Sequence, residues 1–149
     1  MRFSKSTFIL LLAVIFVLPF FIHRLIWLYN AVPSTGTMCF MGKSLNGQFS
    51  SEYPVIRFSS NGHDTVFFNG REGMEFTRAA VVPVLFQKKN PADARINFFS
   101  AIWMDTFINA AIPLVILIIV FLHPDLIPRR SIIIIGKKPL IQFADRAKK

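Results

Sequence analysis

The chain has 149 residues, 53% of them hydrophobic, and its mean hydropathy of +0.49 is high for a water-soluble domain. Two long apolar stretches bracket the more polar residues 30–100, a segment too short to build a large core around an engulfed active site. The formal net charge is +9. Length and composition therefore favour a small membrane protein over a large soluble enzyme.

Residues 1–7 form a short basic N-terminus, and residues 8–29 form the first apolar stretch. As a helix, this stretch would reach about 33 Å, enough to cross a hydrocarbon core of about 30 Å. A cleaved signal peptide is the alternative. Cleavage needs small residues at positions −3 and −1, and the best candidate, after Ala31, places Tyr29 at −3. We therefore expect an uncleaved transmembrane helix.

Residues 30–100 have the turn residues and β-branched or aromatic runs of a β domain. Asn-Gly, the strongest short hairpin signal, occurs three times, at 46–47, 61–62 and 69–70. Five strands in series predict a small antiparallel sheet, barrel-like because closure protects strand edges. The remaining segment, 70–80, is expected to be a loop with Phe76 tucked inward. The expected strands are 35–41, 53–58, 64–68, 81–86 and 95–98, with a turn at Asn90–Asp93 before the last.

Residues 101–122 are the second apolar stretch and the second expected transmembrane helix. Arg24 lies near the outer end of the first stretch, and Asp105 lies near the outer end of the second. In an antiparallel hairpin their depths coincide, so an intramembrane ion pair between Arg24 and Asp105 is geometrically possible. The alternative is that each side chain reaches the nearby interface separately, since either arrangement reduces the cost of a charge in lipid.

Residues 123–149 form a basic tail with seven basic and two acidic residues, whereas the longer segment 30–100 has seven and five. Cationic flanks stay in the cytoplasm. We therefore expect a multi-pass protein of the bacterial inner membrane, with both termini cytoplasmic and the β domain outside. Four basic residues of the tail are candidates for lipid-headgroup contacts: Arg129, Arg130, Lys137 and Lys138.

Between those cations, Ser131–Ile135 ends in four consecutive isoleucines, too few to span a bilayer. The segment either lies in the membrane interface or forms a β-strand that adds to a partner. The clustering of the positive charge beside a span, without a basic stripe interleaved with aromatic residues, argues against nucleic acid as a partner.

The sequence contains no pattern typical of an enzyme or a cofactor site. It has no G-x-S-x-G segment and no phosphate-binding loop. The three histidines, His23, His63 and His123, fall in three different compartments of the expected topology, so they cannot share a metal. We therefore expect no catalytic residues, no metal and no cofactor.

Five motifs follow one another in a recognisable order: Gly36-Thr37, Tyr53–Phe58, Asn61-Gly62, Val82–Phe86 and Asn90–Ile96. In this order and spacing the chain resembles a widespread bacterial family of small membrane proteins that carry a domain of unknown function. The resemblance implies a short β domain between two membrane helices. It implies no activity and no catalytic residues.

The sequence thus predicts an α+β membrane protein in which two transmembrane helices flank a small antiparallel β domain. We expect a non-catalytic accessory subunit in the lipid bilayer, whose β domain binds another envelope protein through strand edges or exposed aromatic residues. Two alternatives stay open. One is an immunity-type protein against a membrane-active or periplasmic toxin, and the other is a small channel or transporter built by homo-oligomerisation.

Overall fold

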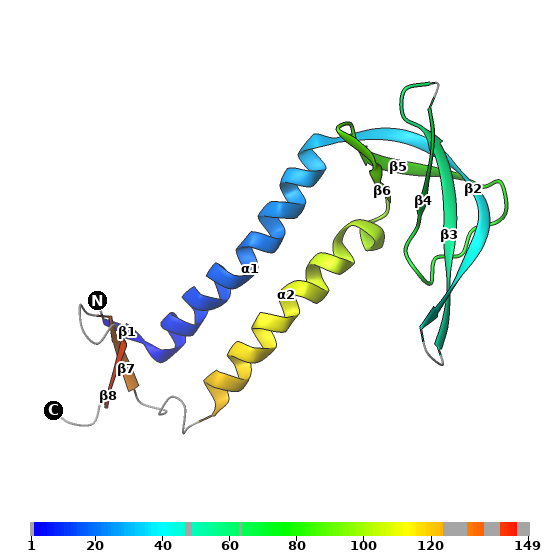
Figure 1. Ribbon diagram of the computed structural model, residues 1–149. Helices are drawn as coiled ribbons and strands as arrows, with labels where there is room; N and C mark the ends of the chain where they lie inside the picture. Colours follow the sequence, from blue (N-terminus) through cyan, green and yellow to red (C-terminus); the bar gives the residue numbers. More distant parts are fainter. Residues whose placement is uncertain (1, 47–48, 63, 124–130, 136–140, 146–149) are drawn as a thin grey trace. The chain divides into compact units, whose positions relative to one another are not determined.

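The computed structural model describes residues 2–46, 49–62, 64–123, 131–135 and 141–145 (Figure 1). The chain divides into two compact units. One unit is His23–Thr106, which holds a five-stranded sheet and the adjoining ends of two helices. The other combines Met1–Ile22 with Phe107–Lys149 and holds the remaining helical turns with a small second sheet.

Both predicted spans are helices. Helix α1 covers Lys5–Asn30 and helix α2 covers Phe99–Leu122, each with a proline in its interior, Pro19 and Pro113. Both are long and apolar enough to cross a membrane by length and composition, and little of their apolar surface is buried in the protein. Within the second unit, Phe21 and Phe107 pack edge to face at 5.6 Å between ring centroids.

The predicted five-stranded antiparallel sheet is confirmed. Its spatial order is β4-β3-β2-β5-β6, and the two outer strands β4 and β6 lie close together, so that the sheet is nearly closed. The strands are β2 (Ala31–Asn46), β3 (Phe49–Ser59), β4 (Thr65–Asn69), β5 (Val81–Gln87) and β6 (Asn90–Ile96).

Strand β2 produces the curl by changing partners along its length (Figure 1). Its first part, Ala31–Thr37, pairs with β5, and Gly36–Asn46 pairs with β3. Where the two pairings overlap, a Cβ on Gly36 would lie 2.7 Å from Ile56 Cγ2 and 2.9 Å from Val84 Cγ2. Only glycine lets the two flanking strands approach this closely, which is a common use of glycine in a strand.

The core of the β domain consists of alternate residues of the five strands, as the period of two requires. Ile56, Val82, Val84 and Ile96 are almost fully buried, and Ala101 adds the first turn of α2 to the same cluster. The other buried members are Met38, Phe58, Phe68 and Phe86. This core joins the start of α2 to the sheet.

The predicted turn at Asn90–Asp93 is wrong, and the last strand, predicted at 95–98, begins at Asn90 and ends at Ile96. The chain turns at Lys88-Lys89, and residues 90–93 already belong to β6. Pro91 is tolerated there because β6 is an outer strand of the sheet, where a missing N–H need not break a ladder. The register slips after Phe86↔Ala94 to Gln87↔Asn90, so the residues between Asn90 and Ala94 form a bulge.

Two of the three Asn-Gly pairs lie within the described residues and have different roles, whereas Gly47 of the third pair lies outside them. Asn61-Gly62 lies in the β3–β4 connection, with Gly62 at a φ of 81°, as a hairpin turn requires. Asn69-Gly70 ends β4 without a hairpin, and a Cβ on Gly70 would lie 2.6 Å from Pro54 Cγ. The 70–80 segment is a loop in which Phe76 packs against the core, as predicted.

The second sheet joins the two ends of the chain. Strand β7 (Ser131–Ile135) pairs antiparallel with β1 (Arg2–Ser4) and with β8 (Ile141–Asp145), and Ile133 is fully buried. The isoleucine run therefore forms a β-strand, but its described partner strands come from this same chain, and its expected addition to another protein stays a prediction. Arg129, Arg130, Lys137 and Lys138 lie outside the described residues.

Candidate functional site

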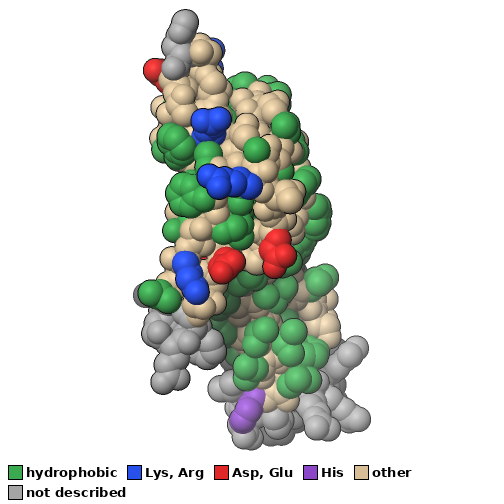
Figure 2. All heavy atoms as spheres, turned by 90° about the vertical axis from the view of Figure 1, so that its right-hand side faces the viewer, with side chains coloured by type: hydrophobic (Ala, Val, Ile, Leu, Met, Phe, Trp, Pro, Cys, Tyr) green, Lys and Arg blue, Asp and Glu red, His purple; other side chains and the backbone are tan. Residues whose placement is uncertain are grey.

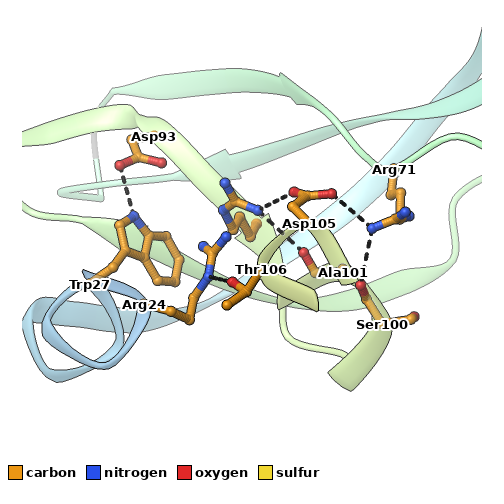
Figure 3. A network of polar contacts seen from close by, with 9 residues as sticks. Arg24, Trp27, Arg71, Asp93, Ser100, Ala101, Asp105 and Thr106 are labelled. Carbon is orange, nitrogen blue, oxygen red and sulfur yellow. Dashed lines mark hydrogen bonds and ion pairs between the residues drawn. The ribbon is translucent and has the colours of Figure 1, made fainter. Parts of the chain in front are cut away.

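A cluster of charged side chains lies where the end of α1 and the start of α2 meet the five-stranded sheet (Figure 3). Asp105 of α2 is its centre. One carboxylate oxygen accepts from Arg71 Nη1 and the other from Arg95 Nη1, both at 2.9 Å. The same two nitrogens lie 3.4 Å from the carbonyl oxygens of Ser100 and Ala101. Asp105 therefore ties the 70–80 loop and strand β6 to the first turns of α2.

Arg24 contributes a third guanidinium from α1. The residue is only 7% exposed, and its Nε donates to Thr106 Oγ1 at 3.0 Å. Its guanidinium carbon lies 5.8 Å from the centre of the Trp27 ring, and that of Arg95 lies 5.6 Å from the same ring. Two cations thus share one indole, an arrangement whose cation–π attraction grows when water is excluded.

Trp27 fixes the end of α1 to the β5–β6 hairpin. Its Nε1 donates to Asp93 Oδ2 at 2.7 Å, and its carbonyl oxygen accepts from Gln87 Nε2 at 2.7 Å. Asp93 lies in the β6 bulge and Gln87 lies at the register slip. The bulge therefore positions the carboxylate of Asp93 to accept the hydrogen bond from the Trp27 indole. Bulges often re-aim a side chain in this way beside functional sites.

A cavity of about 370 Å³ adjoins the cluster. Arg71, Arg95, Asp93, Asp105 and Glu72 lie on its wall. Arg95 Nε is buried and has no hydrogen-bond partner in the described part of the chain. The arrangement can hold a polar or charged group, because the described side chains leave the buried Nε donor of Arg95 unused.

The structure brings Arg24 and Asp105 into one cluster but gives them different partners. Among the described residues there is no ion pair between them, because Asp105 is taken by Arg71 and Arg95 while Arg24 reaches Thr106. Arg24 and Asp105 lie at matching depths in the two helices, which is why the sequence favours a pair between them. Arg71 and Arg95 were missed, because both lie in the β domain, where an arginine gives no local sign of its partner.

The indole N–H of Trp27 gives a direct test of the cluster. Trp27→Phe removes the donor to Asp93 and replaces the buried indole with a smaller ring, so we expect the β domain to lose about 1–2 kcal/mol from the hydrogen bond and a further amount from packing. The control is a double-mutant cycle with Asp93→Ala, which removes the acceptor of the same bond. Thermal unfolding in detergent measures the two single variants and the double variant. If the two single losses simply add in the double variant, the Trp27–Asp93 bond contributes nothing.

Comparisons with protein-family models, with curated proteins and with solved structures find no match to this chain. The family resemblance described above therefore stays a prediction. The proposal for a function therefore rests on the charged cluster around Asp105 and on the five-stranded sheet.

Proposed function

We propose that the chain is a two-pass integral membrane protein of the bacterial inner membrane that binds another envelope protein through its β domain. Helices α1 and α2 present apolar side chains around their circumference, as lipid-facing helices do. Pairing of β1 with β7 brings the two chain ends together, which fits a helical hairpin with both termini in the cytoplasm. The basic flanks favour that orientation.

The open edge of β2 is the observation that supports binding. Beyond Met38, which pairs with Ala79 and Ala80, the β5 side of this strand has no backbone partner among the described residues. Phe40 and Leu45 on this stretch are 57% and 78% exposed. An unpaired strand edge accepts an added strand from a partner, and neighbouring side chains give the selectivity.

The surface around the strands suits a protein partner. Figure 2 shows hydrophobic side chains interspersed with Lys, Arg, Asp and Glu over one face of the β domain. Protein interfaces commonly mix apolar and charged groups in this way, with aromatic residues at the centre. The same edge carries Lys43, a residue type that discourages unselective edge-to-edge pairing.

A pair of substitutions on the edge tests this proposal. A photo-cross-linking residue placed at Ser44 should capture one envelope protein in cells, and Phe40→Lys together with Leu45→Lys should reduce that capture at least tenfold. Because both side chains are exposed, folding should be unaffected. The control is Phe67→Lys on β4, a phenylalanine that is 58% exposed.

Each outcome of this experiment has a distinct meaning. Loss of capture in the edge variant alone supports the proposal. Cross-links only between copies of this chain would replace the envelope partner with a homo-oligomer. Equal capture by the edge variant and by Phe67→Lys would contradict a role for β2.

A further inference from the structure

The charges of the cluster do not balance. Three arginines, Arg24, Arg71 and Arg95, lie with two carboxylates, Asp93 and Asp105. Both oxygens of Asp105 are used by Arg71 and Arg95, and Asp93 accepts from the indole of Trp27. Within the described residues, one guanidinium therefore has no carboxylate partner.

That guanidinium belongs to Arg24. Only 7% of the surface of Arg24 is exposed. Its described partners are the hydroxyl group of Thr106 and the face of the Trp27 ring. Its two Nη atoms have no hydrogen-bond acceptor among the described residues and, unlike Arg95 Nε, are not completely enclosed, so that a ligand can reach them. A buried cation is costly without a counter-charge, and a guanidinium is best satisfied by an oxyanion that accepts two parallel bonds.

Other acidic groups nearby do not supply this counter-charge. Glu72 is exposed on the wall of the adjoining cavity, and no ion pair joins it to an arginine of the cluster in the described chain. The excess is a single positive charge. A phosphodiester carries a single negative charge, and its two free oxygens match the fork of a guanidinium.

We propose that Arg24, with Arg95 beside it, binds the phosphodiester of an anionic phospholipid. This inference rests on the proposed membrane insertion, because the ends of α1 and α2 would then lie at the depth of the headgroups. A lipid such as phosphatidylglycerol brings one net negative charge. Phosphatidylcholine brings its own cation with the phosphate and leaves the excess charge of the cluster unchanged.

The test is binding of phosphatidylglycerol to the purified full chain, first delipidated in mild detergent and then titrated in native mass spectrometry. Wild type should retain one phosphatidylglycerol per chain in preference to phosphatidylcholine. Arg24→Gln should weaken that binding about tenfold, the value of one lost charge-assisted hydrogen bond. The control is Arg57→Gln, which removes an exposed arginine of β3 and should leave binding unchanged.

Inorganic phosphate distinguishes the two sources of the anion. Displacement of the lipid by millimolar phosphate would identify the ligand as free phosphate, and resistance to it supports the lipid. If Arg24→Gln fails to fold, the wild type is tested by itself. Saturable binding of phosphatidylglycerol should then raise the unfolding midpoint of the wild type. Equal retention of the lipid by wild type and a folded Arg24→Gln would overturn the inference.

Failure of the membrane proposal is separately visible. A chain that is released from cell membranes by alkaline carbonate contradicts insertion itself. A chain that resists carbonate but binds no phosphatidylglycerol keeps the membrane proposal and loses only the lipid site.

Discussion

Gly36→Ala is expected to destabilise the β domain by about 2–3 kcal/mol, the cost of overpacking a filled core. The added methyl group would lie 2.7 Å from Ile56 Cγ2, 2.9 Å from Val84 Cγ2 and 3.1 Å from the carbonyl oxygen of Arg57. Ile56 and Val84 are almost fully buried, so neither can move aside. The clash falls where β2 passes from β5 to β3, so the closure of the sheet is what should weaken.

A matched control lies on the same strand. The three atoms nearest to a Cβ on Gly42 would all belong to the outer ring of Tyr53, a half-buried side chain that can turn away. Thermal unfolding in detergent should therefore show a drop on the order of 10 °C for Gly36→Ala and a much smaller one for Gly42→Ala. Similar midpoints for the two variants would contradict the partner exchange of β2 at Gly36.

Asp105→Ala should cost about 2 kcal/mol. Each of its two bonds to an arginine is charge-assisted, and such bonds contribute about 1.5–3 kcal/mol when buried. The Asp105 side chain is 47% exposed and those of Arg71 and Arg95 are 29% exposed, so screening by water lowers the sum. The substitution also leaves two guanidinium groups beside each other without their shared carboxylate.

The measurement is a double-mutant cycle with Arg71→Ala, read out by thermal unfolding. Because both residues act on one bond, the loss in the double variant should be smaller than the sum of the two single losses. Asp64→Ala, at an exposed loop position, should leave the midpoint unchanged. Strict additivity of Asp105→Ala and Arg71→Ala would mean that this ion pair does not stabilise the protein.

The helices and strands could be predicted because their signals are local. The length of the two apolar stretches is enough to predict α1 and α2. The β-branched runs on either side of Asn61-Gly62 are enough to predict β3 and β4. The β5–β6 turn could not be predicted, because Lys88-Lys89 carries no turn signal while Asn90-Pro91 does. The edge position of β6, which makes that proline acceptable, is a property of the whole sheet.

The candidate site was only half predictable. Charged residues are rare in apolar helices because they are costly there, so the sequence alone identifies Arg24 and Asp105 as candidates. The partners of Asp105 lie 34 and 10 residues away, on a loop and on a strand. The positions of residues along the two helices cannot predict Arg71 and Arg95 as partners of Asp105. Their contact with Asp105 depends on how the sheet closes and on the bulge in β6.

The most direct test of the account is the membrane topology, measured by cysteine labelling in a bacterial host. In a Cys39→Ser background, Asn61→Cys places a thiol on the exposed β3–β4 connection, and Lys149→Cys places one at the C-terminus. An impermeant maleimide applied to intact spheroplasts should label the first and should reach the second only after permeabilisation. Labelling of both thiols without permeabilisation, or recovery of the chain in the soluble fraction, would contradict the two-pass membrane protein.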